Sequence, residues 1–304
     1  MKRLPQIAIC TVLAFAASPF VAAASAQDPS GMPDQGPDPA AVNQAPVQDA
    51  PSGPSYTTQA PPPDQAGAPD QNPNDSNYAE QPTQTAPDAP PPLPEYDQPP
   101  PPADDYAWTP GYWAWAPTGY YWVPGAWVEP PYVGALWTPG YWGFYSGRYA
   151  FYPGHWGSHI GFYGGINYGF GYVGLGYEGG YWNGGHFFYN RAYNNVRVGT
   201  VHNVYNYHAN VRVGNGNVAP RASFRGGAGV QARPGPSEAA AWREPYAPRM
   251  NTQVQHEQNF SNVHGQFANE NHGRPASPAI SRPIPADHNV HPQAHSSGGG
   301  APRR

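Results

Sequence analysis

Aromatic, proline and glycine positions recur in a fixed order in the middle of this chain. Four six-residue units each begin on an aromatic residue, carry Pro-Gly at their third and fourth positions, and end on tryptophan. They span 108–113, 122–127, 137–142 and 151–156, so their first aromatics lie 14, 15 and 14 residues apart. A fixed period of this kind predicts one supersecondary unit copied in series.

Each Pro-Gly pair is interpreted as the centre of a turn, because proline fixes φ and glycine accepts a positive φ. The two ends of one unit would then face each other, as Trp108 with Trp113. Two-residue hairpins prefer turn types that L-proline cannot adopt, so wider turns are an alternative. The predicted turn-forming residues are Pro110, Gly111, Pro124, Gly125, Pro139, Gly140, Pro153 and Gly154.

The remaining pattern around the repeat is also typical of strands. Segments 116–119, 130–131 and 146–147 supply the alternate turns, which gives a meander of short strands. From 159 to 196, glycine alternates with aromatic or aliphatic residues, and 196–213 alternates valine or tyrosine with polar residues. A period of two predicts strands. The predicted fold class is therefore mainly β, a short-stranded antiparallel meander of aromatic repeats over 105–218.

The flanking regions have a different composition. Residues 27–104 hold 22 prolines in 78 positions and predict a disordered, Pro-rich arm. Residues 219–304 predict a largely disordered, Arg- and His-containing region with short helices near 237–243 and 252–269. The apolar positions of the second helix are Val254, Phe260, Val263 and Phe267.

The N-terminus has the features of an export signal. Lys2 and Arg3 precede an apolar run over 7–24, and Ala24-Ser25-Ala26 forms a cleavage site. Residues 1–26 are therefore predicted to be a signal peptide, and the single cysteine, Cys10, would leave with it. No transmembrane span is expected in the mature chain. The predicted location is the periplasm or the cell surface, associated with the outer membrane.

Charge is distributed unevenly along the chain. The net charge is −5, but 27–105 carry thirteen acids and no base, whereas 187–304 carry twelve arginines and five acids. The basic region predicts attraction to the chain's own acidic arm, to an anionic partner or to a polyanionic wall polymer. Twelve arginines over that length are sparse, and no nucleic acid is expected as a partner.

Groups for chemistry are few. The segment 106–186 offers only Glu129 and Glu178 as acids, and acid–base catalysis needs paired carboxylates in a pocket. The pair His155 and His159 lacks a third ligand for zinc. His256, His264 and His272 are interpreted as solvated histidines. His288, His291 and His295 are interpreted as weak metal ligands. We therefore expect no enzyme, no metal and no cofactor.

The repeat and the segments after it also carry a resemblance. The WxPGxW units, the block GFYGGINYGFGY, the segment YWNGGHFFYN and parts of 223–275 resemble the bacterial YXWGXW (WXXGXW) repeat family, also called BcpO-related. The resemblance covers about 106–275. It implies an envelope protein of uncharacterised function and brings no catalytic residues. The fourth unit departs from the pattern, with Phe151 at its first position.

Two functions of different classes remain open. The first is a structural or interaction module of the cell envelope, with self-association through β-edges and another envelope protein as a partner. The second is a carbohydrate- or peptidoglycan-binding module that stacks envelope polysaccharide on exposed aromatic rings. The candidate ligand-binding residues are Trp108, Trp113, Trp122, Trp127, Trp137, Trp142 and Trp156.

Overall fold

The computed structural model describes residues 37–46, 82–197, 199–208 and 221–294. The predicted signal peptide, Cys10, His295, most of the Pro-rich arm and the end of the predicted strand segment 196–213 lie outside these residues.

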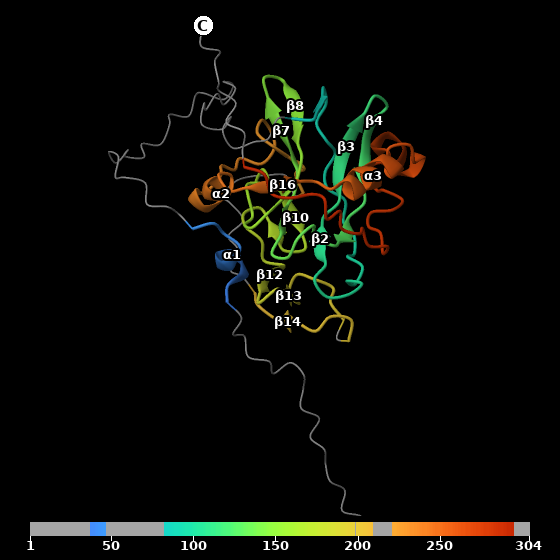
Figure 1. The fold of residues 1–304 in the computed structure, drawn as a ribbon. Coiled ribbons are helices and arrows are strands. Elements are labelled where there is room, and N and C mark those ends of the chain that lie inside the picture. The colour runs from blue at the N-terminus through green and yellow to red at the C-terminus, as the bar shows by residue number, and fades with distance from the viewer. Residues whose placement is uncertain (1–36, 47–81, 198, 209–220, 295–304) are drawn as a thin grey trace, which may run out of the picture. The chain divides into compact units, whose positions relative to one another are not determined.

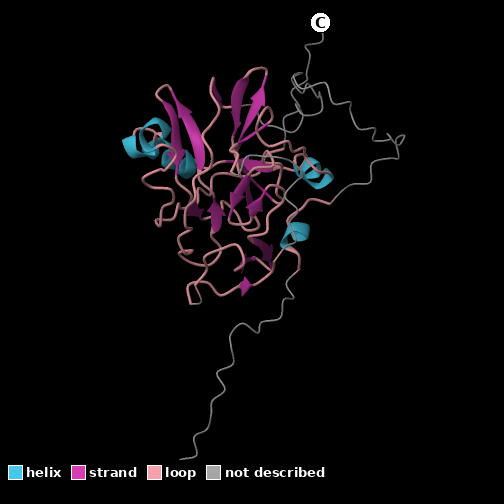
Figure 2. Ribbon diagram, turned by 180° about the vertical axis from the view of Figure 1, so that it is seen from behind, coloured by secondary structure: helices cyan, strands magenta, loops and turns pink. Residues whose placement is uncertain are grey.

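Two long hairpins stand side by side (Figures 1 and 2). Each hairpin has two arms, and each arm consists of two strands with Pro-Gly between them. The first hairpin joins β2 (Ala107–Thr109) and β3 (Tyr112–Ala116) to β4 (Gly119–Val123) and β5 (Ala126–Val128). The second joins β6 (Leu136–Thr138) and β7 (Tyr141–Tyr145) to β8 (Arg148–Tyr152) and β9 (His155–Gly157). The β3–β4 and β7–β8 ends of the hairpins lie at the top of the views in Figures 1 and 2. The hydrogen-bond ladder between the two arms is interrupted at these prolines. Because proline has no backbone N–H, the interruption leaves no proline donor unpaired.

The repeat units pair with each other rather than within themselves. Trp108 faces Trp127 and Trp113 faces Trp122 in the first hairpin. In the second, Trp137 faces Trp156 and Trp142 faces Phe151. The prediction that each Pro-Gly closes a turn is therefore wrong for all eight of its residues, Pro110, Gly111, Pro124, Gly125, Pro139, Gly140, Pro153 and Gly154, which lie in the middle of the hairpin arms.

The alternate turns close the hairpins instead. The first hairpin turns at 116–119, and the second turns at Ser146-Gly147, between the paired residues Tyr145 and Arg148. Ser146 and Gly147 have φ values of 50° and 79°. Two successive positive φ values are those of a type I′ turn, whose twist matches that of the paired strands.

The central glycines are required for space and not for a positive φ. A Cβ on Gly111 would lie 2.4 Å from Cζ2 of Trp122, and one on Gly125 would lie 2.7 Å from Cζ2 of Trp108. The second hairpin repeats the arrangement, with Trp137 over Gly154 and Phe151 over Gly140. None of the four glycines has a positive φ. The first aromatic of each unit thus covers the glycine of the unit that faces it.

Shorter strands from distant parts of the chain extend this centre. β1 (Gln84–Ala86) pairs with β8, β15 (Phe224–Arg225) with β7, and β16 (Tyr246–Pro248) with β9. The Gly- and Tyr-rich region forms the pair β10 (Asn167–Gly169) with β11 (Tyr172–Val173) and the pair β12 (Gly180–Asn183) with β13 (His186–Asn190). β14 (Val204–Tyr205), from the segment that follows, pairs with β13. A mainly β fold of short antiparallel pairs is confirmed. Its connectivity differs from a simple meander because distant segments add strands to the hairpins.

The flanking segments are ordered where the structure describes them, which differs from the disorder predicted for 27–104 and for most of 219–304. We call residues 82–104 the N-terminal strap and residues 276–286 the C-terminal strap. In the first, Leu93 and Gln98 are buried. In the second, Ile280 N–H donates to the carbonyl of Gly125 and Ile284 N–H to that of Trp127, both at 2.9 Å. The hairpins supply hydrogen-bond partners that the proline-rich segments do not supply to each other.

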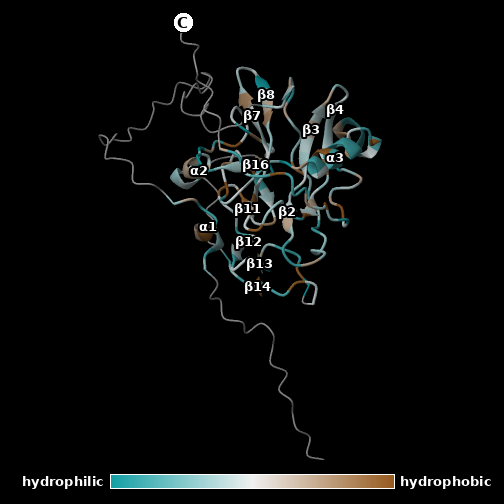
Figure 3. Ribbon diagram, in the orientation of Figure 1, coloured by the Kyte–Doolittle hydropathy of each residue, from teal (hydrophilic) through white to brown (hydrophobic). Residues whose placement is uncertain are grey.

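Helices α2 (Pro236–Ala241) and α3 (Asn251–Phe260) lie near the predicted positions 237–243 and 252–269. The second predicted helix is interrupted, because a 3₁₀ turn at His264–Gln266 and the short α4 (Ala268–Asn271) follow α3. Helix α1 (Pro39–Val42) lies in the arm that was predicted to be disordered. The buried face of α3 is polar, with Gln253 and Glu257 inside, whereas Val263 is exposed. Figure 3 shows α3 in teal beside the pale strands β3 and β4. The apolar positions expected to bury the second helix therefore do not define its core face. None of the described helices has the length and apolar content that a membrane span needs.

The glycine packing gives a direct prediction. Gly154→Ala should lower the free energy of unfolding by about 1–3 kcal/mol, because its Cβ would overlap the Trp137 ring. Gly161→Ala is the control, since its Cβ would meet no atom closer than 3.4 Å and its φ is not positive. Urea unfolding of both variants measures the difference. Equal losses would contradict the proposed packing.

Candidate functional site

The seven tryptophans predicted to bind a ligand lie in the core. Their exposed fractions run from 0% for Trp108, Trp122 and Trp156 to 7% for Trp137. Facing rings pack edge to face or tilted, with centroids 5.1–5.3 Å apart in the four repeat pairs. A sugar ring needs an open aromatic face, and none of these seven offers one. This corrects the expectation for Trp108, Trp113, Trp122, Trp127, Trp137, Trp142 and Trp156.

The indole N–H groups of the ladder point outward to carbonyl groups. Trp113 donates to Pro92 at 3.2 Å, and Trp127 donates to Pro99 at 2.7 Å, both in the N-terminal strap. Trp122 donates to the carbonyl of Pro278 in the C-terminal strap at 2.9 Å. Three buried donors are thus satisfied by prolyl carbonyls from two separate segments.

Two other indole N–H groups donate to acceptors outside the straps, and a third has no partner among the described residues. Trp142 donates to the carbonyl of Trp113 at 2.7 Å and so joins the two hairpins. Trp156 donates to Oε1 of Gln253 on α3 at 2.9 Å. Among the described residues, Nε1 of Trp108 is buried without a partner. An unpaired buried N–H costs stability, which makes Trp108 a natural comparison for its neighbours.

A buried polar cluster attaches α3 to the first hairpin. Glu257 forms an ion pair with Arg249 and accepts hydrogen bonds from Tyr112 at 3.0 Å and Gln84 at 3.1 Å. Tyr121 lies at 3.4 Å from the same carboxylate. Burial, followed by the Glu257 charge, raises the pKa of Tyr112 well above its usual value. Both phenols therefore stay neutral donors, and the cluster is a fixed crosslink.

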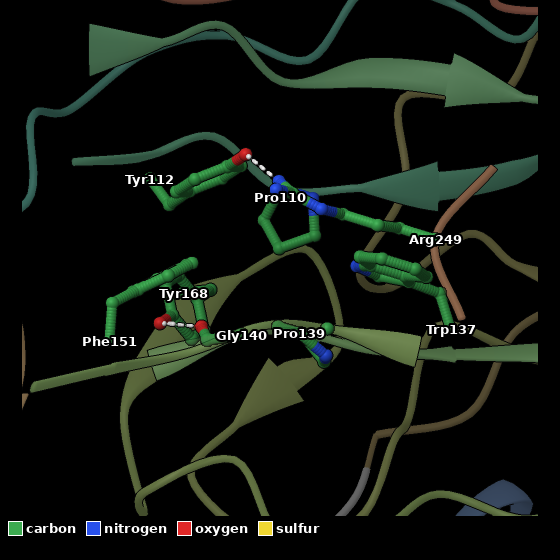
Figure 4. Close-up of a pocket in the computed structure, with 9 residues that line it drawn as sticks. Pro110, Tyr112, Trp137, Pro139, Gly140, Phe151, Tyr168 and Arg249 are labelled. Atoms are coloured by element: carbon green, nitrogen blue, oxygen red, sulfur yellow. Dashed lines mark hydrogen bonds between the residues drawn. The ribbon is translucent and has the colours of Figure 1, made fainter. Parts of the chain in front are cut away.

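A small void lies between the hairpins beside this cluster (Figure 4). Pro110 and Tyr112 line it from the first hairpin, and Trp137, Pro139 and Phe151 line it from the second. Its volume is about 20 Å³, which is room for about one water molecule. Figure 4 shows Tyr112 and Arg249 meeting at one side and Tyr168 bonded to Gly140 at the other. The void is too small for an organic substrate.

Two acidic side chains are buried near α1 and α2. Burial, followed by the nearby charge of Asp38, raises the pKa of Glu178 from 4.5 to about 7. Burial also raises the pKa of Glu238, against hydrogen bonds from Gly235 and Gly176. In each carboxylate one oxygen has no partner among the described residues. The other acid singled out from the sequence, Glu129, accepts a hydrogen bond from Ala286 N–H at 3.3 Å.

The histidines serve different contacts. His155 packs against Tyr246 with ring centroids 5.1 Å apart, and Nδ1 of His159 lies 2.7 Å from Glu244. Burial lowers the pKa of His256, so its neutral ring donates to the Pro124 carbonyl at 2.8 Å. The spaced histidines of the C-terminal region do not converge. No group of three or more His, Cys, Asp or Glu side chains within the described ranges is placed to hold a metal ion.

Comparison with known proteins identifies the repeat. The family model of the WXXGXW repeat matches residues 104–128 in two copies. The chain contains WXXGXW repeats. The matched residues include the two WXXGXW units of the first hairpin, and the second hairpin has the same pairing of aromatics over glycines. No curated protein and no solved structure matched the chain. The narrower relation to BcpO stays a prediction.

Sequence reasoning missed the residues that hold the WXXGXW hairpins to their surroundings. Gln84, Arg249, Gln253 and Glu257 lie in segments of polar or proline-rich composition, and Gln84 falls in the predicted disordered arm. Residues 253 and 257 of α3 are four apart and so lie on one face of the helix. This spacing was the only feature of the sequence that could have indicated a polar contact face. Their partners are determined by the fold and not by spacing.

The pKa of Glu178 gives a testable pH dependence. Its folded value is raised, so the folded chain keeps a proton that the unfolded chain releases between about pH 4.5 and 7. Stability therefore falls as pH rises through this window. Glu178→Gln should be more stable than the wild type by about 1–3 kcal/mol at pH 8 and equal to it below pH 4. Urea unfolding across pH measures this, and a constant difference would refute it.

Proposed function

We propose that this chain is an exported cell-envelope protein whose two aromatic hairpins form a non-enzymatic structural or interaction module for proline-rich chain segments. The observation that carries the proposal is the set of indole N–H bonds to the carbonyls of Pro92, Pro99 and Pro278. The module comprises residues 107–157. The proline-rich segments that the module contacts in this structure are the N-terminal and C-terminal straps.

The chemistry of proline suits this role. A proline-rich segment lacks N–H donors but keeps its carbonyl acceptors, and its restricted φ lowers the entropy lost on binding. Aromatic grooves recognise such segments with ring contacts and carbonyl hydrogen bonds. Here Tyr120 also donates to the carbonyl of Asp88 at 2.8 Å, and Ser223 donates to Pro90 at 3.0 Å. The module therefore holds the N-terminal strap at the carbonyls of Asp88, Pro92 and Pro99, and Ser223, which lies outside the module, holds that of Pro90.

Export and envelope location are supported by the sequence features of residues 1–26. The absence of an enzymatic role is proposed from the chemistry of the described groups. Their buried acids are dispersed, and the polar cluster at Glu257 is closed by mutual hydrogen bonds. Self-association through β-edges, and binding to another envelope protein or to envelope polysaccharide, remain proposals. The tryptophan ladder itself has no exposed face to offer a polysaccharide.

A matched pair of substitutions tests the module. Trp127→Phe keeps a ring but removes the donor to Pro99, whereas Trp108→Phe removes a donor that has no described partner. Trp108→Phe also removes the ring atom that covers Gly125, so the two variants are compared by cleavage of the strap and not by stability. Protease should cleave the N-terminal strap faster in Trp127→Phe, because that variant loses the hydrogen bond to Pro99. If both variants show the same cleavage of this strap, the strap contacts do not support the module.

Export is tested separately in the native host. Antibody detection in fractionated cells should place the chain in the periplasm, outer membrane or medium. N-terminal sequencing should begin at Gln27. A cytosolic chain that retains residues 1–26 would overturn the proposed location without bearing on the strap contacts.

A further inference from the structure

An open cavity lies between the N-terminal strap and the β10–β11 loop. Its volume is about 250 Å³, more than ten times that of the void in Figure 4. Apolar and aromatic side chains form most of its wall: Leu93, Pro94, Tyr96, Trp122, Tyr168 and Phe170. Concave sites with aromatic walls and a few polar groups are the usual form of small-ligand pockets.

The polar groups of the cavity come from Glu95, Asn167 and Arg221. Arg221 forms an ion pair with Glu95, and its Nε donates to the carbonyl of Leu93 at 2.7 Å. Leu93 N–H donates in return to the carbonyl of Arg221 at 3.0 Å. The two segments are therefore fixed to each other, and the remaining guanidinium donors stay beside the cavity.

The backbone holds the aromatic wall in an unfavourable conformation. Phe170 has a φ of 53°, between Gly169 and Gly171 at 75° and 93°. A residue with a side chain loses about 1–2 kcal/mol in this left-handed region, where glycine would lose little. The strand pair β10–β11 also shifts register beside it. Arg221, another lining residue, has a φ of 71°. Backbone strain of this kind concentrates at binding and catalytic sites.

The loop directs the Phe170 ring toward the strap. Its centroid lies 5.1 Å from that of Tyr96 and 5.5 Å from that of Trp108. Tyr96 is fixed in turn, because its hydroxyl accepts a hydrogen bond from Gly111 N–H at 3.0 Å. The cavity therefore has an aromatic wall built from two rigid anchors, one in the strap and one in the loop.

We propose that this cavity binds one ring of a neutral saccharide. The Glu95–Arg221 pair cancels its own charge, so neither an anion nor a cation has a net electrostatic advantage there. Carboxylate, amide and guanidinium groups together accept and donate hydrogen bonds, which suits hydroxyl groups that do both. The apolar face of a sugar ring suits Tyr96 and Phe170. The site is independent of the proposed module, which would stand if the cavity bound nothing.

The test uses the full chain and N,N′-diacetylchitobiose as the probe, with digalacturonate as the acidic comparison. Two-dimensional NMR should show saturable shifts at Phe170 and Asn167, with millimolar affinity for the neutral disaccharide and weaker binding of the acidic one. Phe170→Ala should weaken binding about ten-fold, the equivalent of one aromatic contact. Phe170→Tyr should retain binding because it keeps the ring.

Two further variants keep the test decisive if Phe170→Ala does not fold. Asn167 is exposed, so Asn167→Ala removes a polar group without opening the core and should weaken binding several-fold. Trp242→Ala alters a half-buried ring that does not line the cavity and should leave binding unchanged. No shifts with the neutral probe, equal binding of both probes, or loss only in Trp242→Ala would overturn the proposal. So would a proline tripeptide that shifts the same signals at lower concentration.

Discussion

The packing of one aromatic ring over one glycine on the facing arm determines the rest of this structure. Trp122 covers Gly111 and Trp108 covers Gly125, so that two repeat units interlock across the first hairpin. The final tryptophan of each unit then meets the first aromatic of its partner. Proline occupies the position where the ladder is interrupted and no N–H is needed. Each feature of the WxPGxW unit that repeats along this chain thus has a separate physical reason.

The interlock also explains why the flanking segments are ordered. Packed tryptophans bury large rings, but each ring carries an N–H that must find an acceptor. The N-terminal strap provides the carbonyls of Pro92 and Pro99, and the C-terminal strap provides that of Pro278. Helix α3 offers Gln253 to Trp156 and Glu257 to Tyr112. The segments that cover the aromatic core are polar or proline-rich. We attribute this to the indole and phenol donors of the core, which require hydrogen-bond acceptors more than they require further apolar surface.

The sequence was sufficient for the fold class, the repeat, the approximate positions of α2 and α3, and the turns at 116–119 and 146–147. It did not decide the pairing of the units, because WxPGxW is nearly symmetric. Trp108 meets a tryptophan whether it pairs with Trp113 or with Trp127. The preference of short hairpins for turns that exclude L-proline agrees with the second pairing, which the sequence pattern alone did not suggest. The order of the straps was not predicted, because an argument from composition considers apolar side chains and leaves out backbone carbonyl acceptors. The cavity beside Phe170 was not predicted either, because it depends on a left-handed backbone conformation that the local sequence pattern does not indicate.

The central claim is most directly tested by NMR of the four central glycines, Gly111, Gly125, Gly140 and Gly154. The packing described here predicts strongly upfield-shifted Hα signals, since each glycine lies beneath an aromatic ring of the facing unit. It also predicts contacts from Gly111 to Trp122 and from Gly125 to Trp108 in nuclear Overhauser spectra. Unshifted glycine signals, together with contacts between Trp108 and Trp113 of a single unit, would contradict it.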